Sequence, residues 1–338
     1  MFACRRRRDI TGQKDRKVAN VLVVGGAGYV GGALTDQLLQ TPNRVRVYDS
    51  LVYEESYRKP VDFVLGDVRD WDRLAPQLRW ADVVVWLAAI VGDGACALNP
   101  DLTVELNDVS VRRLAERFDG RIVFTSTCSV YGTNDDLLDE QSPVNPLSIY
   151  AQTKLSAEGH LLDKNAISFR LGTLFGVADN FSRIRMDLAV NVLTAKAYAY
   201  RRVSVFGGNQ YRPLLHVRDV AGAILRTLET RHTGVFNLHA VNMRIAELAD
   251  RLKAQFPDLE VQRTDLKFQD SRNYRVSSQK AIEAFGFEAK YSVDDGIAEL
   301  KAILEAGRIK NISLSRHSNQ RFLRDVLDRP SSPVGFEI

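Results

Sequence analysis

The sequence is short of the residues from which metal sites and disulfides are built. Its 338 residues include three cysteines (Cys4, Cys96 and Cys128), none in a Cys-x-x-Cys pair, and five scattered histidines whose spacing matches no metal-ligand pattern. We therefore predict no metal site, and a reduced, cytoplasmic setting. No stretch approaches the ~20 apolar residues of a transmembrane helix, and the N-terminus lacks the apolar segment of a signal peptide. We accordingly expect no membrane association.

An excess of charge of one sign is confined to the N-terminus. The chain holds 46 Lys+Arg and 42 Asp+Glu, a net charge of +4, but seven basic and two acidic residues fall within residues 1–17. That segment carries +5 and the remainder −1, so the folded body is too near neutrality to present a nucleic-acid surface. We predict a disordered basic tail over 1–17. The alternative is an arm that binds a membrane surface or nucleic acid.

Short apolar runs alternate with amphipathic segments in the first half of the chain. Residues 18–24 and 82–89 are apolar enough for buried strands, whereas 29–40 and 103–118 have the periodicity of helices. This alternation is typical of βαβ units, and strands that are apolar throughout are typical of a parallel sheet covered on both faces. With 45% apolar residues, the chain is long enough for a large α/β unit and a second, smaller one.

A glycine-rich turn follows the first predicted strand and opens the first predicted helix. Gly25, Gly28 and Gly31 have the spacing that allows a tight turn, close approach of a pyrophosphate to the backbone, and packing of helix on strand. Asp49 ends the next strand, where a carboxylate accepts from the adenosine ribose and repels a 2′-phosphate, which favours NAD over NADP. Asp67, after a further strand, would hold the adenine amino group. A purely structural turn is the alternative for either motif.

Tyr150 and Lys154 are four residues apart at a predicted helix start, on one face of the helix. A free phenol has a pKa near 10, and a neighbouring ammonium together with a cationic nicotinamide favours the phenolate. Tyr150 can then take a proton from a substrate hydroxyl as hydride leaves the same carbon. Thr127, at a strand end upstream, would orient that hydroxyl. A surface pair is the alternative for Tyr150 and Lys154, since the spacing alone is common.

In combination these motifs, with Arg170 and the segment 212–219, resemble the extended short-chain dehydrogenase/reductase family, the NAD-dependent nucleotide-sugar epimerases and dehydratases of the UDP-glucose 4-epimerase type. The resemblance covers about residues 19–305. It implies a Rossmann doubly wound parallel sheet with a smaller C-terminal α/β substrate domain, bound NAD, a UDP- or GDP-linked sugar as substrate, and a homodimer. The boundaries we expect are a Rossmann domain over 18–176 with returning segments near 212–238, a sugar-binding domain over 177–307, and a loosely packed tail over 308–338 with a short helix at 321–327.

The resemblance also assigns residues to roles. Thr127, Tyr150 and Lys154 would form the catalytic triad. The cofactor would contact Gly25, Gly28, Tyr29, Val30, Asp49, Asp67, Val68, Leu87, Ala88, Ala89, Asn107, Tyr150 and Lys154, although for Asn107 a structural role is the alternative. The substrate would contact Thr127, Cys128, Thr173, Asn191, Arg212 and Arg272.

Several positions depart from the family pattern. The 4,6-dehydratases carry an acidic pair directly after the triad Ser/Thr, and here Cys128 and Ser129 stand in those two places, which argues against 4,6-dehydration. Cys128 is expected to be a buried thiol packed beside the nicotinamide, with an acid/base role as the alternative. Trp86 replaces the usual His before Leu-Ala-Ala, and Thr173 replaces an Asn that touches the substrate.

Arginines define the expected substrate end, because a guanidinium pairs with phosphate through two hydrogen bonds. Arg212 and Arg272 are predicted to hold the diphosphate, with solvated surface charges as the alternative. Residues 181–187 are expected to face the substrate, and Asp93 either frames the sugar or lies on an exposed loop. We predict an epimerase acting at C4 of a nucleotide-linked hexose. A 4-keto-sugar reductase, a variant dehydratase that uses Cys128, and a catalytically idle NAD-binding scaffold remain alternatives.

Overall fold

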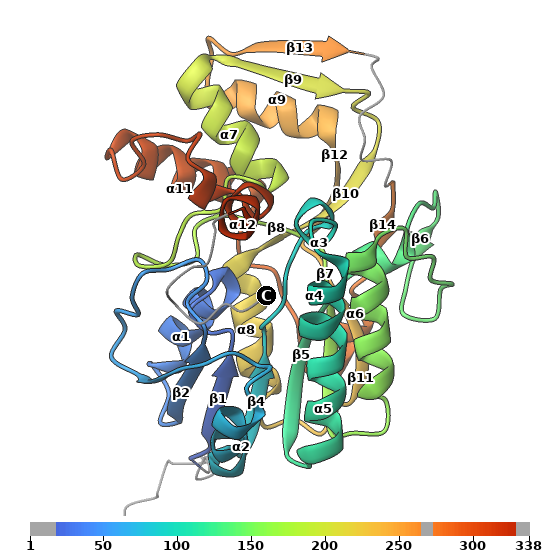
Figure 1. The fold of residues 1–338 in the computed structure, drawn as a ribbon. Helices are drawn as coiled ribbons and strands as arrows, with labels where there is room; N and C mark the ends of the chain where they lie inside the picture. Colours follow the sequence, from blue (N-terminus) through green and yellow to red (C-terminus); the bar gives the residue numbers. More distant parts are fainter. Residues whose placement is uncertain (1–17, 265–272, 329–338) are drawn as a thin grey trace, which may run out of the picture.

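The computed structural model describes residues 18–264 and 273–328. Its larger part is a seven-stranded sheet, the lower half of Figure 1, in which every neighbouring pair of strands is parallel. The strand order is β11-β7-β5-β4-β1-β2-β3. The bounds are β1 (Asn20–Val24), β2 (Arg44–Asp49), β3 (Asp62–Leu65), β4 (Val83–Trp86), β5 (Arg121–Thr127), β7 (Ala166–Leu171) and β11 (Gly234–Leu238).

Helices cover both faces of this sheet, which explains why its strands are apolar throughout. Val21 and Val23 of β1 face a cluster shared with α1 and α8, whereas Leu22 and Val24 face one shared with α2, α5 and α6. Successive side chains of a strand point to opposite faces, so both sets are buried. The bounds are α1 (Tyr29–Leu38), α2 (Trp71–Trp80), α5 (Ser110–Arg117), α6 (Ile149–His160) and α8 (Val217–Thr227).

A second unit packs three helices on short strands, in the upper half of Figure 1. One sheet has the order β12-β10-β8 and another pairs β13 with β9. Phe175, Leu252 and Ile297, from β8, α9 and α11, lie in its core. The bounds are β8 (Thr173–Phe175), α7 (Ala189–Tyr200), β9 (Arg202–Phe206), β10 (Tyr211–His216), β12 (Val241–Arg244), α9 (Ile245–Gln255), β13 (Glu260–Thr264) and α11 (Val293–Glu305).

The returning segment predicted near 212–238 divides between the two units. Its last part, β11, extends the large sheet beside β7, and α8 packs on α1. Its first part, β10, pairs instead with β8 and β12 of the smaller unit. Strand β14 (Arg275–Val276) pairs with β6 (Leu137–Leu138), and helix α10 (Gln279–Phe285) begins three residues later.

The long helix predicted over 103–118 is interrupted. It consists of α4 (Pro100–Val104), a π-helical turn η1 (Glu105–Val109) and α5. Within that turn the Asn107 side chain is fully buried and bonds both the amide and the carbonyl of Ile90, at 2.8 and 2.9 Å. The turn therefore ties this helix to the loop after β4.

Residues 308–328 do not form the loosely packed tail that we expected. They contain a 3₁₀ turn η3 (Ser315–His317) and helix α12 (Asn319–Leu327), which begins close to the predicted short helix. His317, Asn319 and Leu323 are buried, so this polar segment is held in the fold largely by hydrogen bonds to distant residues. Among the described residues, no helix has the length and apolar content that crossing a bilayer requires.

Candidate active site

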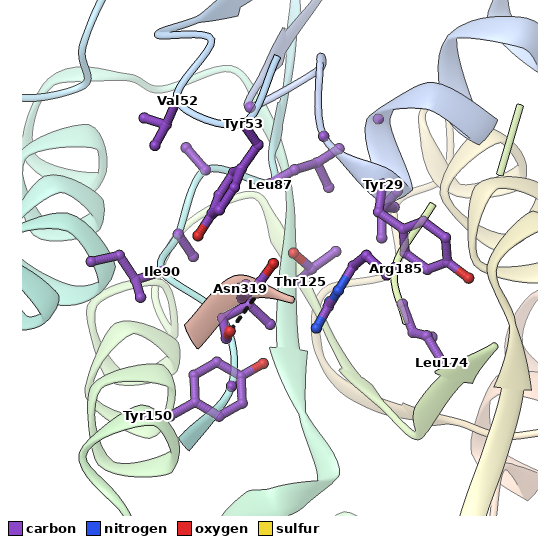
Figure 2. A pocket seen from close by; sticks show the side chains of 18 of the residues that line it. Tyr29, Val52, Tyr53, Leu87, Ile90, Thr125, Tyr150, Leu174, Arg185 and Asn319 are labelled. Atoms are coloured by element: carbon purple, nitrogen blue, oxygen red, sulfur yellow. Dashed lines mark hydrogen bonds between the residues drawn. The ribbon is translucent and has the colours of Figure 1, made fainter. Parts of the chain in front are cut away.

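A cavity of about 550 Å³ runs along the carboxyl edge of the large sheet, from the glycine turn to β10. Ligands of open α/β sheets bind at this edge. Figure 2 shows the part around Tyr150, where side chains from several elements converge. The cavity is lined by most of the residues predicted to bind cofactor or substrate: Gly25, Gly28, Tyr29, Val30, Asp49, Asp67, Val68, Leu87, Ala88, Ala89, Thr127, Tyr150, Lys154, Thr173 and Arg212.

The glycine turn has the geometry that a pyrophosphate requires. Gly25 has a φ of +83°, and a Cβ there would lie 2.4 Å from the amide nitrogen of Ala88, so a side chain is excluded. A Cβ at Gly28 would meet only the carbonyl oxygen of Gly25, at 3.4 Å, which leaves the backbone open to a ligand. A Cβ at Gly31 would lie 2.4 Å from the carbonyl of Gly26, where α1 packs on the turn. The first amides of α1 therefore face the cavity as anion donors.

Two carboxylates stand at the adenosine end of the cavity. Asp49, the last residue of β2, accepts from the amides of Ala27 at 3.0 Å and Leu51 at 2.7 Å, and burial raises the pKa of its carboxyl group. These bonds fix the carboxylate where the adenosine ribose would lie. Asp67 forms an ion pair with Arg69 at 2.9 Å, in the loop after β3.

Thr127, Tyr150 and Lys154 meet at the other end. Thr127 ends β5, and its hydroxyl accepts from the amide of Ser129 at 3.1 Å as the chain turns into the 3₁₀ segment η2 (Cys128–Tyr131). Tyr150 lies in the first turn of α6, which Ser148 caps by accepting from the amide of Ala151. Lys154, one turn later, donates to the carbonyl of Thr125 at 2.8 Å.

Burial acts on both ionisable members of this group. It raises the pKa of the Tyr150 phenol above its ordinary value, and a hydrogen bond with Thr127 opposes this shift. Burial also lowers the pKa of the Lys154 ammonium to about 8. Burial therefore favours the neutral phenol, whereas an added positive charge, such as an oxidised nicotinamide ring would supply, favours the phenolate.

Cys128 does not contact the cavity, contrary to the prediction that it binds substrate. Its side chain is fully buried in an apolar cluster with Val130, Tyr131 and Tyr274. The thiol donates to the carbonyl of Arg170 at 3.2 Å, and burial raises its pKa. Such a thiol stays protonated, so the acid/base alternative has no support in this geometry.

Asn191 and Asn107 also lie outside the cavity lining. Asn191, on α7, accepts from the amide of Gly176 at 3.0 Å and donates to the carbonyls of Arg185 at 2.9 Å and Gly176 at 3.3 Å, which leaves no N–H for a substrate phosphate. Its role is to shape the loop that carries Arg185. Asn107 has the structural role described above. Arg272, the second predicted phosphate ligand, falls outside the described residues.

The cavity is also lined by polar residues to which the sequence assigned no individual role, among them Tyr53, Arg183, Arg185 and Asn319. Figure 2 shows Tyr53, Arg185 and Asn319 directed toward the space above Tyr150. Arg185 donates to Asp187 at 2.9 Å, and Arg183 donates to the carbonyl of Arg316 at 2.9 Å and to the Asn319 side chain. The only signal in the sequence was the pattern Arg-Ile-Arg within 181–187, the segment expected to face the substrate. Asp93 also lines the cavity and accepts from Ser148 at 2.7 Å.

A parallel Rossmann sheet, a glycine turn and a Thr–Tyr–Lys group in one cavity define the extended short-chain dehydrogenase/reductase class. The sequence matches the model of the NAD dependent epimerase/dehydratase family over residues 21–238, and the chain belongs to that family. NAD is the cofactor of the family, and the open glycine turn and the placement of Asp49 suit it.

Relatives of known activity cover most of the chain. UDP-glucuronic acid decarboxylase 6 of Arabidopsis thaliana is 27% identical over 297 residues, 82% of this chain and 86% of its own. The structure of UDP-glucose 4-epimerase from Thermotoga maritima with UDP-glucose matches with a TM-score of 0.75 at 22% identity, over 86% of this chain and 100% of that one. MoeE5 in complex with UDP-glucose and NAD matches with a TM-score of 0.74 at 23% identity, over the same shares. These structural likenesses show the fold.

Proposed function

We propose that the protein epimerises a nucleotide-linked hexose at C4 through a 4-keto sugar. The observation that carries this proposal is the meeting of Tyr150, Thr127 and Lys154 in the same cavity as the glycine turn and Arg212. One space thus offers a base, a place for the cofactor and a cation for a diphosphate. The family membership supports the coarser reaction type, and the choice of C4 is the proposal.

Each residue has a distinct task in this reaction. Thr127 holds the sugar hydroxyl beside Tyr150, which accepts its proton as the carbon loses hydride. The glycine turn and Asp49 would hold NAD, which would supply a reversible hydride acceptor, so that epimerisation would need no external oxidant. Lys154, held by the carbonyl of Thr125, places a positive charge behind the phenol. Arg212 is placed to bind the diphosphate.

The side chains after Thr127 favour epimerisation over dehydration. Expelling a 6-hydroxyl requires a proton donor at the sugar, and Cys128 points away from the cavity with a raised pKa. Ser129, which does line the cavity, is no carboxylic acid. Neither group can protonate a leaving hydroxyl. We therefore expect the 4-keto sugar to take hydride back rather than to lose water.

A second candidate is oxidative decarboxylation of a nucleotide-linked uronic acid. Arg183 and Arg185 bring two guanidinium groups to the cavity, beside the carboxylates of Glu54 and Asp187, and a guanidinium is suited to pair with the carboxylate of an acidic sugar. A carboxylate next to C5 of a 4-keto sugar is a β-keto acid, which loses CO₂ readily. The similarity to UDP-glucuronic acid decarboxylases agrees with this candidate.

Proton NMR on the purified protein distinguishes these reactions. The protein is given UDP- and GDP-hexoses, their N-acetyl forms and UDP-glucuronic acid, with no added cofactor. A new C4 isomer with unchanged total sugar supports the proposal. A nucleotide-linked pentose with release of CO₂ supports the second candidate. A 4-keto-6-deoxy product contradicts the argument from Cys128 and Ser129. If none of these sugars changes, the protein is given a 4-keto sugar with added NADH, and turnover then indicates a reductase.

A further inference from the structure

Helix α12 packs against two loops that lie on either side of the glycine turn. On one side, the ring of Phe322 lies 5.2 Å from that of Tyr53, in the loop after β2. On the other side, Leu323 is only 6% exposed and shares an apolar cluster with Ile90 and Cys96, in the loop and helix after β4. Strand β1 lies between β2 and β4 in the sheet, and the glycine turn follows β1. The helix therefore crosses above the turn.

The segment before α12 is fixed by hydrogen bonds to the loop that carries Arg185. The carbonyl of His317 accepts from the amide of Met186 at 2.7 Å, and the amide of Asn319 donates to Asp187 at 2.7 Å. The Asn319 side chain also donates to the carbonyl of Val91 at 2.9 Å. These bonds join residues more than a hundred positions apart, so the start of α12 has a defined place over the cavity.

The inner face of α12 lines the same cavity as the glycine turn. Asn319 lies near Tyr150 in Figure 2, and Leu323, Val326 and Leu327 follow it along the helix as further lining residues. Apolar side chains of Val52, Leu102 and Leu106 line the cavity as well. A long cofactor laid from Asp49 to Tyr150 would thus have the glycine turn beneath it and apolar surface of α12 above it.

We propose that α12 is the roof of the NAD site: Phe322 and Leu323 dock it on both sides of the cofactor channel, and bound NAD leaves only when the helix undocks. The proposal depends on NAD as cofactor and not on which sugar is the substrate. Its consequence is slow release of NAD, which suits a reaction that returns the hydride to the sugar it came from. A closed roof also excludes water from the reacting carbon.

Release of NAD from the full-length protein tests the roof. The double variant Phe322→Ala/Leu323→Ala removes both docking contacts, and we expect its NAD dissociation rate to rise by about tenfold or more, because weakened contacts act mainly on dissociation. Arg324→Ala, on the exposed side of the same helix, is the matched control and should stay within about twofold of the parent. Circular dichroism verifies that each variant is folded. A folded double variant with an unchanged release rate overturns the proposal, even if its KM for sugar changes.

Hydrogen exchange on the unaltered protein gives a second test that no folding defect can obscure. If NAD binds under α12, NAD binding and helix docking stabilise each other. NAD must then stabilise the docked helix by the same free energy by which docking strengthens NAD binding. Amides of residues 319–327 should then exchange about tenfold or more slowly in the NAD-loaded protein than in protein stripped of NAD. Protection at residues 25–31 without any change in α12 overturns the proposal.

Discussion

Glu158 and Arg170 form a buried ion pair directly behind the reactive strand, with Nη2 of Arg170 2.7 Å from Oε2 of Glu158. Glu158 lies on α6, two turns after Tyr150, and Arg170 lies on β7. The hydroxyl of Ser126, next to Thr127 on β5, donates to the same carboxylate. Glu158 thus joins α6 to β7 through Arg170 and to β5, the strand that carries Thr127, through Ser126. These bonds help to set the distance between the Thr127 hydroxyl and the Tyr150 phenol.

Breaking this pair should destabilise the fold. In Glu158→Gln the guanidinium of Arg170 stays buried without its counter-charge, and we expect a loss of about 3–5 kcal/mol in the free energy of unfolding. Urea denaturation measures it. Glu158→Leu/Arg170→Met, which removes both charges, should lose less than the single variant. A single variant within 1 kcal/mol of the parent protein would show that the pair does not hold α6 in place.

Removing the phenolic hydroxyl should abolish most turnover without releasing the cofactor. Tyr150→Phe eliminates the proton acceptor, and we expect kcat to fall by about 10²–10⁴-fold. NAD content after purification should match that of the parent protein. Tyr200→Phe, an exposed position on α7, provides the same chemical change away from the cavity and should leave kcat unaltered. Retained turnover in Tyr150→Phe would exclude Tyr150 as the base.

The buried ammonium of Lys154 should lower the free energy of unfolding at neutral pH. Its pKa is depressed by burial to about 8, from 10.5, so the folded protein disfavours the ammonium by about 3 kcal/mol. Below pH 8 Lys154 is charged in both the folded and the unfolded chain, so the full destabilisation is present. Between pH 8 and 10.5 the unfolded chain binds more protons, so stability rises with pH until the cost is gone.

Lys154→Met should therefore unfold at higher urea than the parent protein at pH 7, although it loses activity. The difference between the two proteins should shrink as the pH rises from 8 to 10.5. Lys164→Met, an ammonium that pairs with Asp119 at the surface, serves as control and should show no such trend. A destabilised Lys154→Met protein at pH 7 would mean that the hydrogen bond to Thr125 outweighs the cost of burial.

Asp49 should determine the choice of cofactor. Asp49→Asn keeps the shape and one acceptor for the amide of Ala27 but removes the charge that repels a 2′-phosphate. We expect the preference for NAD over NADP to fall by about tenfold or more, an effect of 1.4 kcal/mol. Isothermal titration of stripped protein with each cofactor measures it. An unchanged ratio would place the adenosine ribose elsewhere.

The sequence predicted the parts of the site that depend on local spacing. Gly25, Gly28 and Gly31 lie within one turn and its helix, and Tyr150 and Lys154 lie on one helical face, so their geometry follows from a few neighbouring residues. Its sequence position could not place the Cys128 side chain, because the 3₁₀ turn after Thr127 directs the thiol away from the cavity, to the carbonyl of Arg170. Asn319 could not be found at all, since its position depends on bonds to Asp187 and Val91, far away in the chain.

The interleaving of the two units has a consequence for engineering. The chain passes from β10 of the smaller unit into α8 and β11 of the larger one, and then returns to β12. A chimaera joined once at residue 176 would give α1 a foreign helix to pack on and β7 a foreign neighbour. Grafting a new sugar specificity onto this scaffold therefore requires keeping residues 217–238 native, with the donor segments inserted on both sides of them.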